Sequence, residues 1–159
     1  MPIFNIQTKA QQKDAAGRTI DLPPQVGLLR QGPVIPVTVR LEANIAKPIL
    51  AQGQAIMGQP GVALIDTGAS ISAIDEQIAK DLRIPVVDRG RMSSASREST
   101  PCNLYPVEFT IGNTIVVQVP RAMGAVIRQK GFIAIIGRDI LQSCTLIYNG
   151  PLGTVTLAM

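Results

Sequence analysis

The sequence predicts a single all-β domain, and three observations support that fold class. The chain of 159 residues has 14 Gly and 12 Pro, a content that favours tight turns. Only 3% of its residues are aromatic, while Val, Ile and Thr, which are enriched in strands, are frequent. Hydrophobic residues make up 46% and charged residues 16%, so the chain can bury a real core and extensive disorder is not expected.

Residues 1–31 differ from the rest, so we assign them to an N-terminal extension and residues 32–159 to the main domain. A polar run at 11–14 is followed by Leu22-Pro23-Pro24, where the prolines oppose both a helix and a central strand. A surface arm is the leading interpretation. A removable segment that occupies a cleft and a covering strand remain open as alternatives.

The main domain begins with a predicted strand over residues 34–42. Val37, Val39 and Leu41 alternate there with polar residues, the period of a half-buried strand. The short apolar run 62–65 predicts a fully buried strand that ends in a turn.

A short helix is predicted over residues 75–82, because apolar residues recur there at four-residue spacing and Asp75 can cap the first turn. Pro85 ends it. The remaining predicted elements, in chain order, are a long hairpin tip at 89–101, strands at 105–111 and 115–119, a buried run at 132–136, a helical turn at 140–142 and a terminal hairpin at 144–157.

Composition narrows the possible functions. The net charge is +4, but the 15 basic residues are scattered from Lys9 to Arg138, so we expect no nucleic-acid partner. The chain has no His and only two cysteines, Cys102 and Cys144, which excludes His-dependent catalytic pairs and a tetrahedral zinc site. We therefore expect no metal and no cofactor, and any catalysis must use carboxylates, hydroxyls, lysines or backbone groups.

The sequence shows neither the continuous apolar segment of a signal peptide nor a membrane-spanning stretch. We expect a soluble, cytoplasmic protein without a membrane segment in this chain. A membrane tether in a longer precursor is left open.

Two motifs carry chemistry. The first is Asp66-Thr67-Gly68, which follows the apolar run 62–65, and the second is Gly137-Arg138-Asp139, which follows the run 132–136. As a pair, extended to Ala63–Ala69 and Ile135–Leu141, they resemble the two conserved segments of the retropepsin-like aspartic proteases of retroviruses and bacteria. The resemblance implies a closed retropepsin-like β barrel with one or two short helices, and a homodimer.

The chemistry of peptide hydrolysis supports the same prediction independently of the resemblance. Metal-free peptide hydrolysis needs a base to activate water and an acid to protonate the leaving nitrogen, and two carboxylates about 3 Å apart that share one proton offer both. The chain has a single Asp-Thr-Gly, so a second identical chain must supply the partner of Asp66. Among relatives, the residue at Thr67 hydrogen-bonds across the dimer, and Gly68 allows close backbone approach. Ala69 lacks the hydroxyl that pepsin-like relatives carry, so we expect activity at mildly acidic pH.

The resemblance also assigns supporting and substrate-binding residues. Gly137, Arg138 and Asp139 are expected to brace the active-site loop, although Ser70 stands where retroviral enzymes commonly carry the Asp that pairs with this Arg. The hairpin tip 92–97 resembles the flap that closes over bound peptide, but no Gly lies between Arg91 and Phe109. The expected substrate-binding residues are Leu64, Ala69, Ser70, Ala73, Ser94, Ala95, Ile133 and Ile135.

The leading prediction is thus an aspartic endopeptidase that cleaves a peptide or protein substrate, with the terminal hairpin 144–157 supplying the dimer sheet. The alternative is a retropepsin-fold peptide-binding or dimerisation module that no longer cleaves. A structural β domain whose Asp-Thr-Gly is only a tight turn is a third possibility. Self-processing within residues 1–31 is a further expectation.

Overall fold

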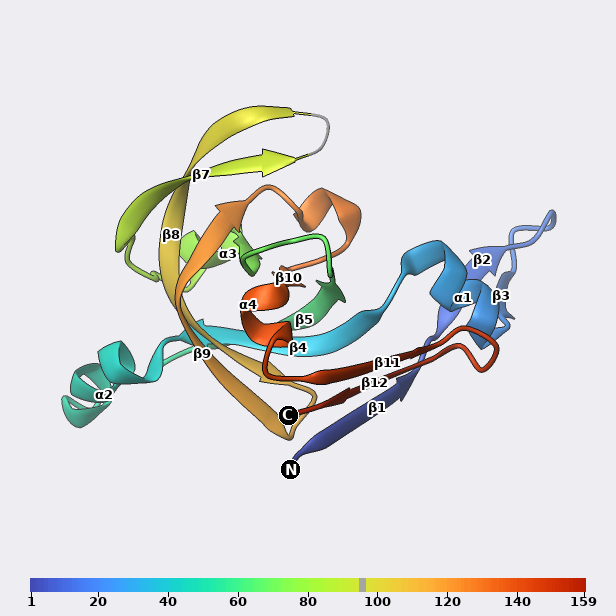
Figure 1. The fold of residues 1–159 in the computed structure, drawn as a ribbon, viewed down its shortest axis with the longest axis horizontal. Helices are drawn as coiled ribbons and strands as arrows, with labels where there is room; N and C mark the ends of the chain where they lie inside the picture. The colour runs from blue at the N-terminus through green and yellow to red at the C-terminus, as the bar shows by residue number, and fades with distance from the viewer. Residues whose placement is uncertain (95–96) are drawn as a thin grey trace.

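A closed barrel of six strands forms the body of the protein (Figure 1). The computed structural model describes residues 1–94 and 97–159. In their order around the barrel, the strands are β4 (Val34–Leu41), β5 (Gly58–Ile65), β10 (Ala134–Ile136), β6 (Ala73–Asp75), β9 (Ile115–Ala125) and β8 (Arg97–Ile111). The barrel closes because β4 also pairs with β8. The predicted all-β class and closed barrel are therefore confirmed.

Alternation along the strands fills the barrel interior. In β4, Ile35, Val37 and Val39 point inward and are buried, as the period of two predicts. Phe109 of β8 is the largest fully buried side chain. The predicted strands at 34–42, 62–65, 105–111 and 115–119 all lie in this barrel.

Strand β8 belongs to two structures. Its second half, Val107–Ile111, pairs with β4 in the barrel, while its first half pairs with β7 (Asp88–Ser94) from Arg97 to Leu104. We call this β7–β8 hairpin, residues 88–104, the flap. It confirms the predicted long hairpin, although residues 95–96 of the predicted tip lie outside the described part of the chain.

A second sheet lies beside the barrel in the order β1 (Ile3–Gln7), β12 (Thr154–Ala158) and β11 (Thr145–Asn149) (Figure 1). The predicted terminal hairpin is the β11–β12 pair. The strand β1 pairs with β12, and its Phe4 and Ile6 pack against the main core. Of the three alternatives for the N-terminus, the covering strand describes β1.

The rest of the N-terminal segment also folds onto the domain. Strands β2 (Ala10–Lys13) and β3 (Thr19–Leu22) form a hairpin, and α1 (Pro24–Gln31) follows. The prolines were expected to oppose a helix here, and that expectation is wrong. Pro24 occupies the first turn of α1, where its fixed φ favours a helix and its missing amide costs nothing.

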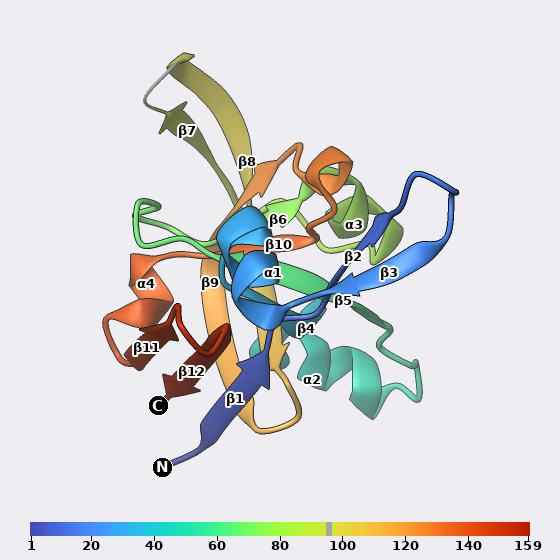
Figure 2. The ribbon, with the colours of Figure 1, turned by 90° about the vertical axis from the view of Figure 1, so that its right-hand side faces the viewer.

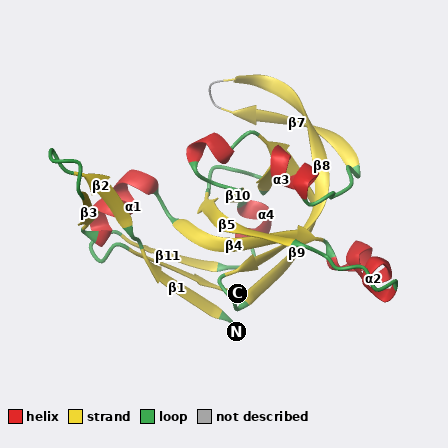
Figure 3. Cartoon of the chain, turned by 180° about the vertical axis from the view of Figure 1, so that it is seen from behind, coloured by secondary structure: helices red, strands yellow, loops and turns green. Residues whose placement is uncertain are grey.

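Within the described residues the chain has four α-helices and the 3-10 helix η1 (Arg128–Lys130), more than the one or two short helices predicted. The predicted pair is confirmed as α3 (Glu76–Asp81) and α4 (Arg138–Leu141). The second helix missed is α2 (Ala43–Ala51), which projects from the barrel (Figure 3). Glu42 caps it through the amides of Asn44 and Ile45, and this local stabilisation outweighs the internal Pro48.

None of the helices in residues 1–94 and 97–159 combines the length and the apolar character needed to cross a membrane.

Candidate active site

Asp66 lies directly after β5, at the point where this strand leaves the barrel. Strand β5 runs parallel to β10, with Ile65 opposite Ile136. The amide of Asp66 still donates to the Ile136 carbonyl at 3.0 Å, so the paired strands fix the backbone of the aspartate. Its side chain is half-buried. The Asp66 carboxylate is therefore held by the barrel and remains reachable from solvent.

The turn after Asp66 folds back onto its carboxylate. The amide of Gly68 donates to Asp66 Oδ1 at 2.8 Å. A Cβ atom at position 68 would lie 3.0 Å from the same oxygen, closer than such atoms normally approach. Gly68 thus leaves space beside the carboxylate, and Thr67 is exposed on the surface of the loop.

Arg138, on α4, holds this loop from below. Its Nη1 donates to the carbonyls of Thr67 (2.7 Å) and Gly68 (3.0 Å), and its Nη2 donates to Ser70 Oγ (2.8 Å). The Ser70 hydroxyl therefore takes the place of the acidic partner that retroviral enzymes carry. The predicted bracing contact of Arg138 with the loop is present in the structure, but it is made of carbonyls and a hydroxyl rather than an ion pair.

The two motif loops are joined a second time through Ser72, which is fully buried. The amide of Gly137 donates to Ser72 Oγ at 2.9 Å, and Ser72 Oγ donates to Asp139 Oδ1 at 2.6 Å. Asp139 also accepts the amides of Ser72 and Ile140, so it supports both the loop and the first turn of α4. A Cβ at Gly137 would lie 2.8 Å from the carbonyl carbon of Ile71, which explains the requirement for glycine.

Three of the expected substrate-binding residues share one face of the barrel sheet. Leu64 of β5, Ile135 of β10 and Ala73 of β6 are register neighbours on adjacent strands. Directly opposed residues project from the same face, and their sequence neighbours Ala63, Ala134 and Ile74 point into the main core. Leu64, Ile135 and Ala73 consequently lie on the face turned away from that core.

A small apolar cluster covers part of this face. It consists of Ala73, Ala125 and Ile127, with Met92, Met123 and Ile135 packed against them. Met92 belongs to the flap, so the flap contacts the same face that carries Ala73 and Ile135. Met92 lies in the predicted flap tip, but neither Met92 nor Ile127 was among the expected substrate-binding residues.

The other expected substrate-binding residues lie elsewhere. Ala69 is half-buried in the Asp66 loop, and Ser70 is the exposed acceptor of Arg138. Ile133 packs against the main core, above Gly61. Ala95 and the side chain of Ser94 lie outside the described part of the structure.

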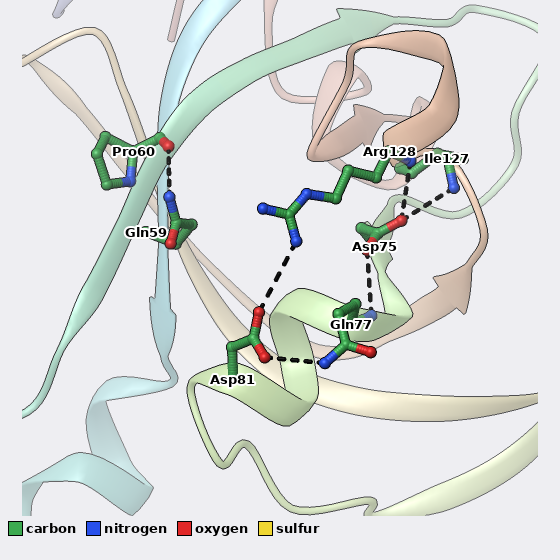
Figure 4. Close-up of polar contacts among 7 residues, drawn as sticks. All are labelled: Gln59, Pro60, Asp75, Gln77, Asp81, Ile127 and Arg128. Carbon is green, nitrogen blue, oxygen red and sulfur yellow. Dashed lines mark hydrogen bonds and ion pairs between the residues drawn. The ribbon is translucent and has the colours of Figure 1, made fainter.

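A buried carboxylate next to the site ties β6 to the segment that follows β9 (Figure 4). Asp75 is only 3% exposed. It accepts the amide of Gln77 at 3.1 Å, as predicted for the cap of α3, and also the amides of Ile127 (3.0 Å) and Arg128 (2.9 Å). Asp75 thereby positions Ile127 in the apolar cluster. The nearby Arg128–Asp81 ion pair, at 3.9 Å between exposed side chains, contributes little to stability.

The model of a family described as aspartyl protease matches residues 54–140, which is more than half of the chain and includes both motifs. A retropepsin-like aspartic protease from Rickettsia conorii is among the similar solved structures, with 13% identity and a TM-score of 0.46 over 98% of this chain and 90% of that chain. The sequence matches none of the curated proteins with which it was compared.

Proposed function

Since the chain belongs to the aspartyl protease family, we propose that it is an aspartic endopeptidase whose active site forms between two copies of the chain. The family assignment confirms the resemblance predicted from Asp66-Thr67-Gly68 and Gly137-Arg138-Asp139. The cleavage reaction and the dimer are the proposal.

The proposed chemistry uses Asp66 and Asp66 of the partner subunit. Two carboxylates about 3 Å apart cannot both ionise, so they share one proton. The ionised member takes a proton from a water molecule, whose oxygen attacks the carbonyl carbon of the scissile peptide bond. The protonated member gives its proton to the carbonyl oxygen. The tetrahedral intermediate then breaks its C–N bond as the protonated carboxyl gives its proton to the nitrogen. The ionised carboxylate takes a proton from one hydroxyl of the intermediate, so a carboxylic acid and an amine leave and the dyad again holds one proton.

The observation that carries the proposal is the fixed position of the Asp66 carboxylate. Gly68 donates to it directly, and Arg138 holds the surrounding loop at three points. The bond from Gly68 alone is that of an ordinary Asx turn. This turn differs from a purely structural one because Arg138, about 70 positions away, also holds the loop around the carboxylate. Such preorganisation is what acid–base catalysis requires.

The surface around Asp66 supports the dimer. The end of the flap, the loop after β5, α4 and β11 all lie on the same side of the molecule (Figure 2). In the described residues β11 pairs only with β12, and its Ile147 is 53% exposed. An unpaired strand edge with exposed apolar side chains favours pairing with another chain. A partner on this side would bring its own Asp66 loop toward this one.

The first test is a cleavage assay on an unfolded protein at several pH values, comparing the chain with Asp66→Asn. We expect hydrolysis only with the carboxylate present, with an optimum at mildly acidic pH. Equal rates for the two proteins would eliminate the endopeptidase.

The second test addresses the dimer by sedimentation at several concentrations, with Ile147→Lys on β11 and Leu50→Lys on α2 as a matched pair. The side chains of Leu50 and Ile147 are almost equally exposed, at 52% and 53%, but α2 projects from the barrel on the side away from β11 (Figure 1). We expect Ile147→Lys to be monomeric and inactive and Leu50→Lys to behave as the parent. A parent dimer that binds peptide without cleaving it would instead support the non-cleaving module.

A further inference from the structure

The described arms of the flap are tied to each other. Arg91 of β7 donates from Nε to Ser99 Oγ at 2.9 Å and from Nη2 to the Ser99 carbonyl at 2.6 Å. The flap has a single glycine, Gly90, which lies near the start of β7 and thus near the base, and glycine is the residue that most readily absorbs large backbone changes. Movement of the flap relative to Asp66 is therefore expected at its base.

The base of the flap lies at Tyr105. There β8 changes its partners, because Leu104 still pairs with β7 whereas Val107 pairs with β4. The register of β8 against β9 also shifts between Tyr105 and Val107. Such a bulge bends a strand and interrupts its ladder. The β8–β9 ladder is consequently interrupted at the place where the flap would turn.

Two side chains from outside the flap bind this base. Arg121 of β9 pairs with Asp88, but both side chains are largely exposed, so this ion pair contributes little. The second contact is partly buried. Glu76, the first residue of α3, accepts the Tyr105 hydroxyl at 2.7 Å and the Asn103 amide nitrogen at 2.9 Å, both at Oε1. Asn103 lies in the flap and pairs with Arg89 of β7. Tyr105 is 2% exposed and belongs to the main core. A single carboxylate oxygen thus joins the flap to the barrel core.

The neighbouring strand leaves room for this contact. A Cβ atom at Gly124 of β9 would overlap Glu76 Oε2 and would stand 2.8 Å from Cε2 of Tyr105. Burial, followed by the bond to Glu76, raises the pKa of Tyr105 to about 12. The phenol therefore keeps its proton and remains a donor at physiological pH.

We propose that Glu76 is a positioning residue, which sets the angle of the flap over Asp66 by holding Asn103 and Tyr105. The expected effect on substrate binding rests on the proposed endopeptidase activity. The bonds at Glu76 are made by side chains, so they can break without disrupting a β ladder. Without these bonds the flap moves more easily relative to Asp66, and substrate binding weakens. The chemical step is retained, because Arg138 holds the Asp66 loop independently of the flap.

The test compares Tyr105→Phe with Tyr148→Phe, which removes the hydroxyl of the only other tyrosine in the chain. Tyr148 bonds to the Leu28 carbonyl at 3.4 Å, away from the flap. Amide hydrogen exchange of residues 88–104 is measured against that of β5 and β10, together with KM and kcat for peptide cleavage. We expect Tyr105→Phe to speed exchange in the flap alone and to raise KM about 3- to 10-fold with kcat retained.

Two Glu76 variants add a graded series. Glu76→Ala should reproduce Tyr105→Phe, whereas Glu76→Gln keeps an acceptor oxygen and should lie between Glu76→Ala and the parent. The positioning role is refuted if flap exchange in Tyr105→Phe equals that in Tyr148→Phe, or if β5 and β10 exchange faster to the same extent. Hydrogen exchange needs no catalysis, so a parent protein that fails to cleave peptides refutes the endopeptidase while the exchange result still decides the role of Glu76.

Discussion

Two carboxylates, Asp139 and Glu76, hold the two parts of the candidate site in different ways. Asp139 binds Ser72 through backbone and side chain, inside a set of bonds that joins the two motif loops. Glu76 binds only side chains of β8 among its described hydrogen bonds. Backbone groups take part in the bonds that hold the two motif loops, which form the floor of the site, whereas Glu76 holds the flap, which forms its cover, through side chains alone. The difference suggests a floor that stays fixed while the flap can move.

The largest expected effect comes from removing the support of the floor. Arg138→Ala eliminates three hydrogen bonds to the Asp66 loop. A displacement of about 1 Å at a catalytic group costs on the order of 10²-fold in rate, so we expect kcat for peptide cleavage to fall by about that factor. Arg138→Lys should recover little, because an ammonium group cannot contact the three acceptors as a planar guanidinium does. Full activity in Arg138→Ala would mean that the backbone bonds from α4 to Ala69 and Ser70 hold the loop without the guanidinium.

A smaller effect is expected on stability at Ser72. Ser72→Ala leaves the buried amide of Gly137 without its acceptor and removes a donor to Asp139. An unsatisfied buried group of this kind costs about 1–3 kcal/mol, measured as the free energy of unfolding in urea. Ser70→Ala serves as the control, because that hydroxyl is exposed and water can replace it. Equal losses in the two variants would contradict the buried connection between the motif loops.

A substitution at Gly124 tests the contact of Glu76 with the base of the flap. Gly124→Ala forces the Glu76 carboxylate away from Tyr105 and crowds the buried Tyr105 ring, at a cost of about 1–3 kcal/mol. The flap should loosen, as hydrogen exchange of residues 88–104 would show. Gly150→Ala is the control, since a Cβ there meets only Tyr148 at 3.8 Å, an ordinary contact. Unchanged flap exchange in Gly124→Ala would show that Glu76 is not held in place by this glycine.

The floor was predictable from the sequence, because its signals are local. An apolar run ending in Asp66-Thr67-Gly68 predicts a strand and a turn, and the second run ending in Gly137 predicts its neighbour. The contact between Arg138 and the loop followed from the family resemblance. Its acceptors did not, because Ser70 replaces the expected acidic residue and hydrogen bonds to carbonyls leave no trace in side-chain chemistry.

The cover was predictable as a hairpin and, through the family resemblance, as a flap, but its contacts with the barrel were not. The functions of Glu76, Asn103 and Tyr105 depend on how α3 meets β8, and 27 to 29 positions separate them along the chain. The role of Ser72 in joining the motif loops was not predicted for the same reason, since its partners Gly137 and Asp139 are distant in sequence. The strand β1 did carry a local signal, because Phe4 and Ile6 alternate with exposed neighbours. The polar run that follows β1 nevertheless favoured the prediction of a surface arm.

The smallest expected effect is a pH dependence of the unfolding free energy that arises at Tyr105, on the flap side of the site. The pKa of Tyr105 is raised from 10 to about 12, by burial and then by Glu76. A group whose pKa is raised on folding contributes stability that is complete below its unfolded value and is lost as pH rises toward the folded value. Between pH 10 and 12 the parent should therefore lose unfolding free energy relative to Tyr105→Phe, by at most about 1.4 kcal/mol per pH unit. Urea titrations of both proteins at pH 9, 10 and 11 measure this difference, and all other titrating groups are common to the two. Parallel curves would mean that the Tyr105 phenol ionises as freely in the folded chain as in the unfolded one, which is incompatible with a buried donor held by Glu76.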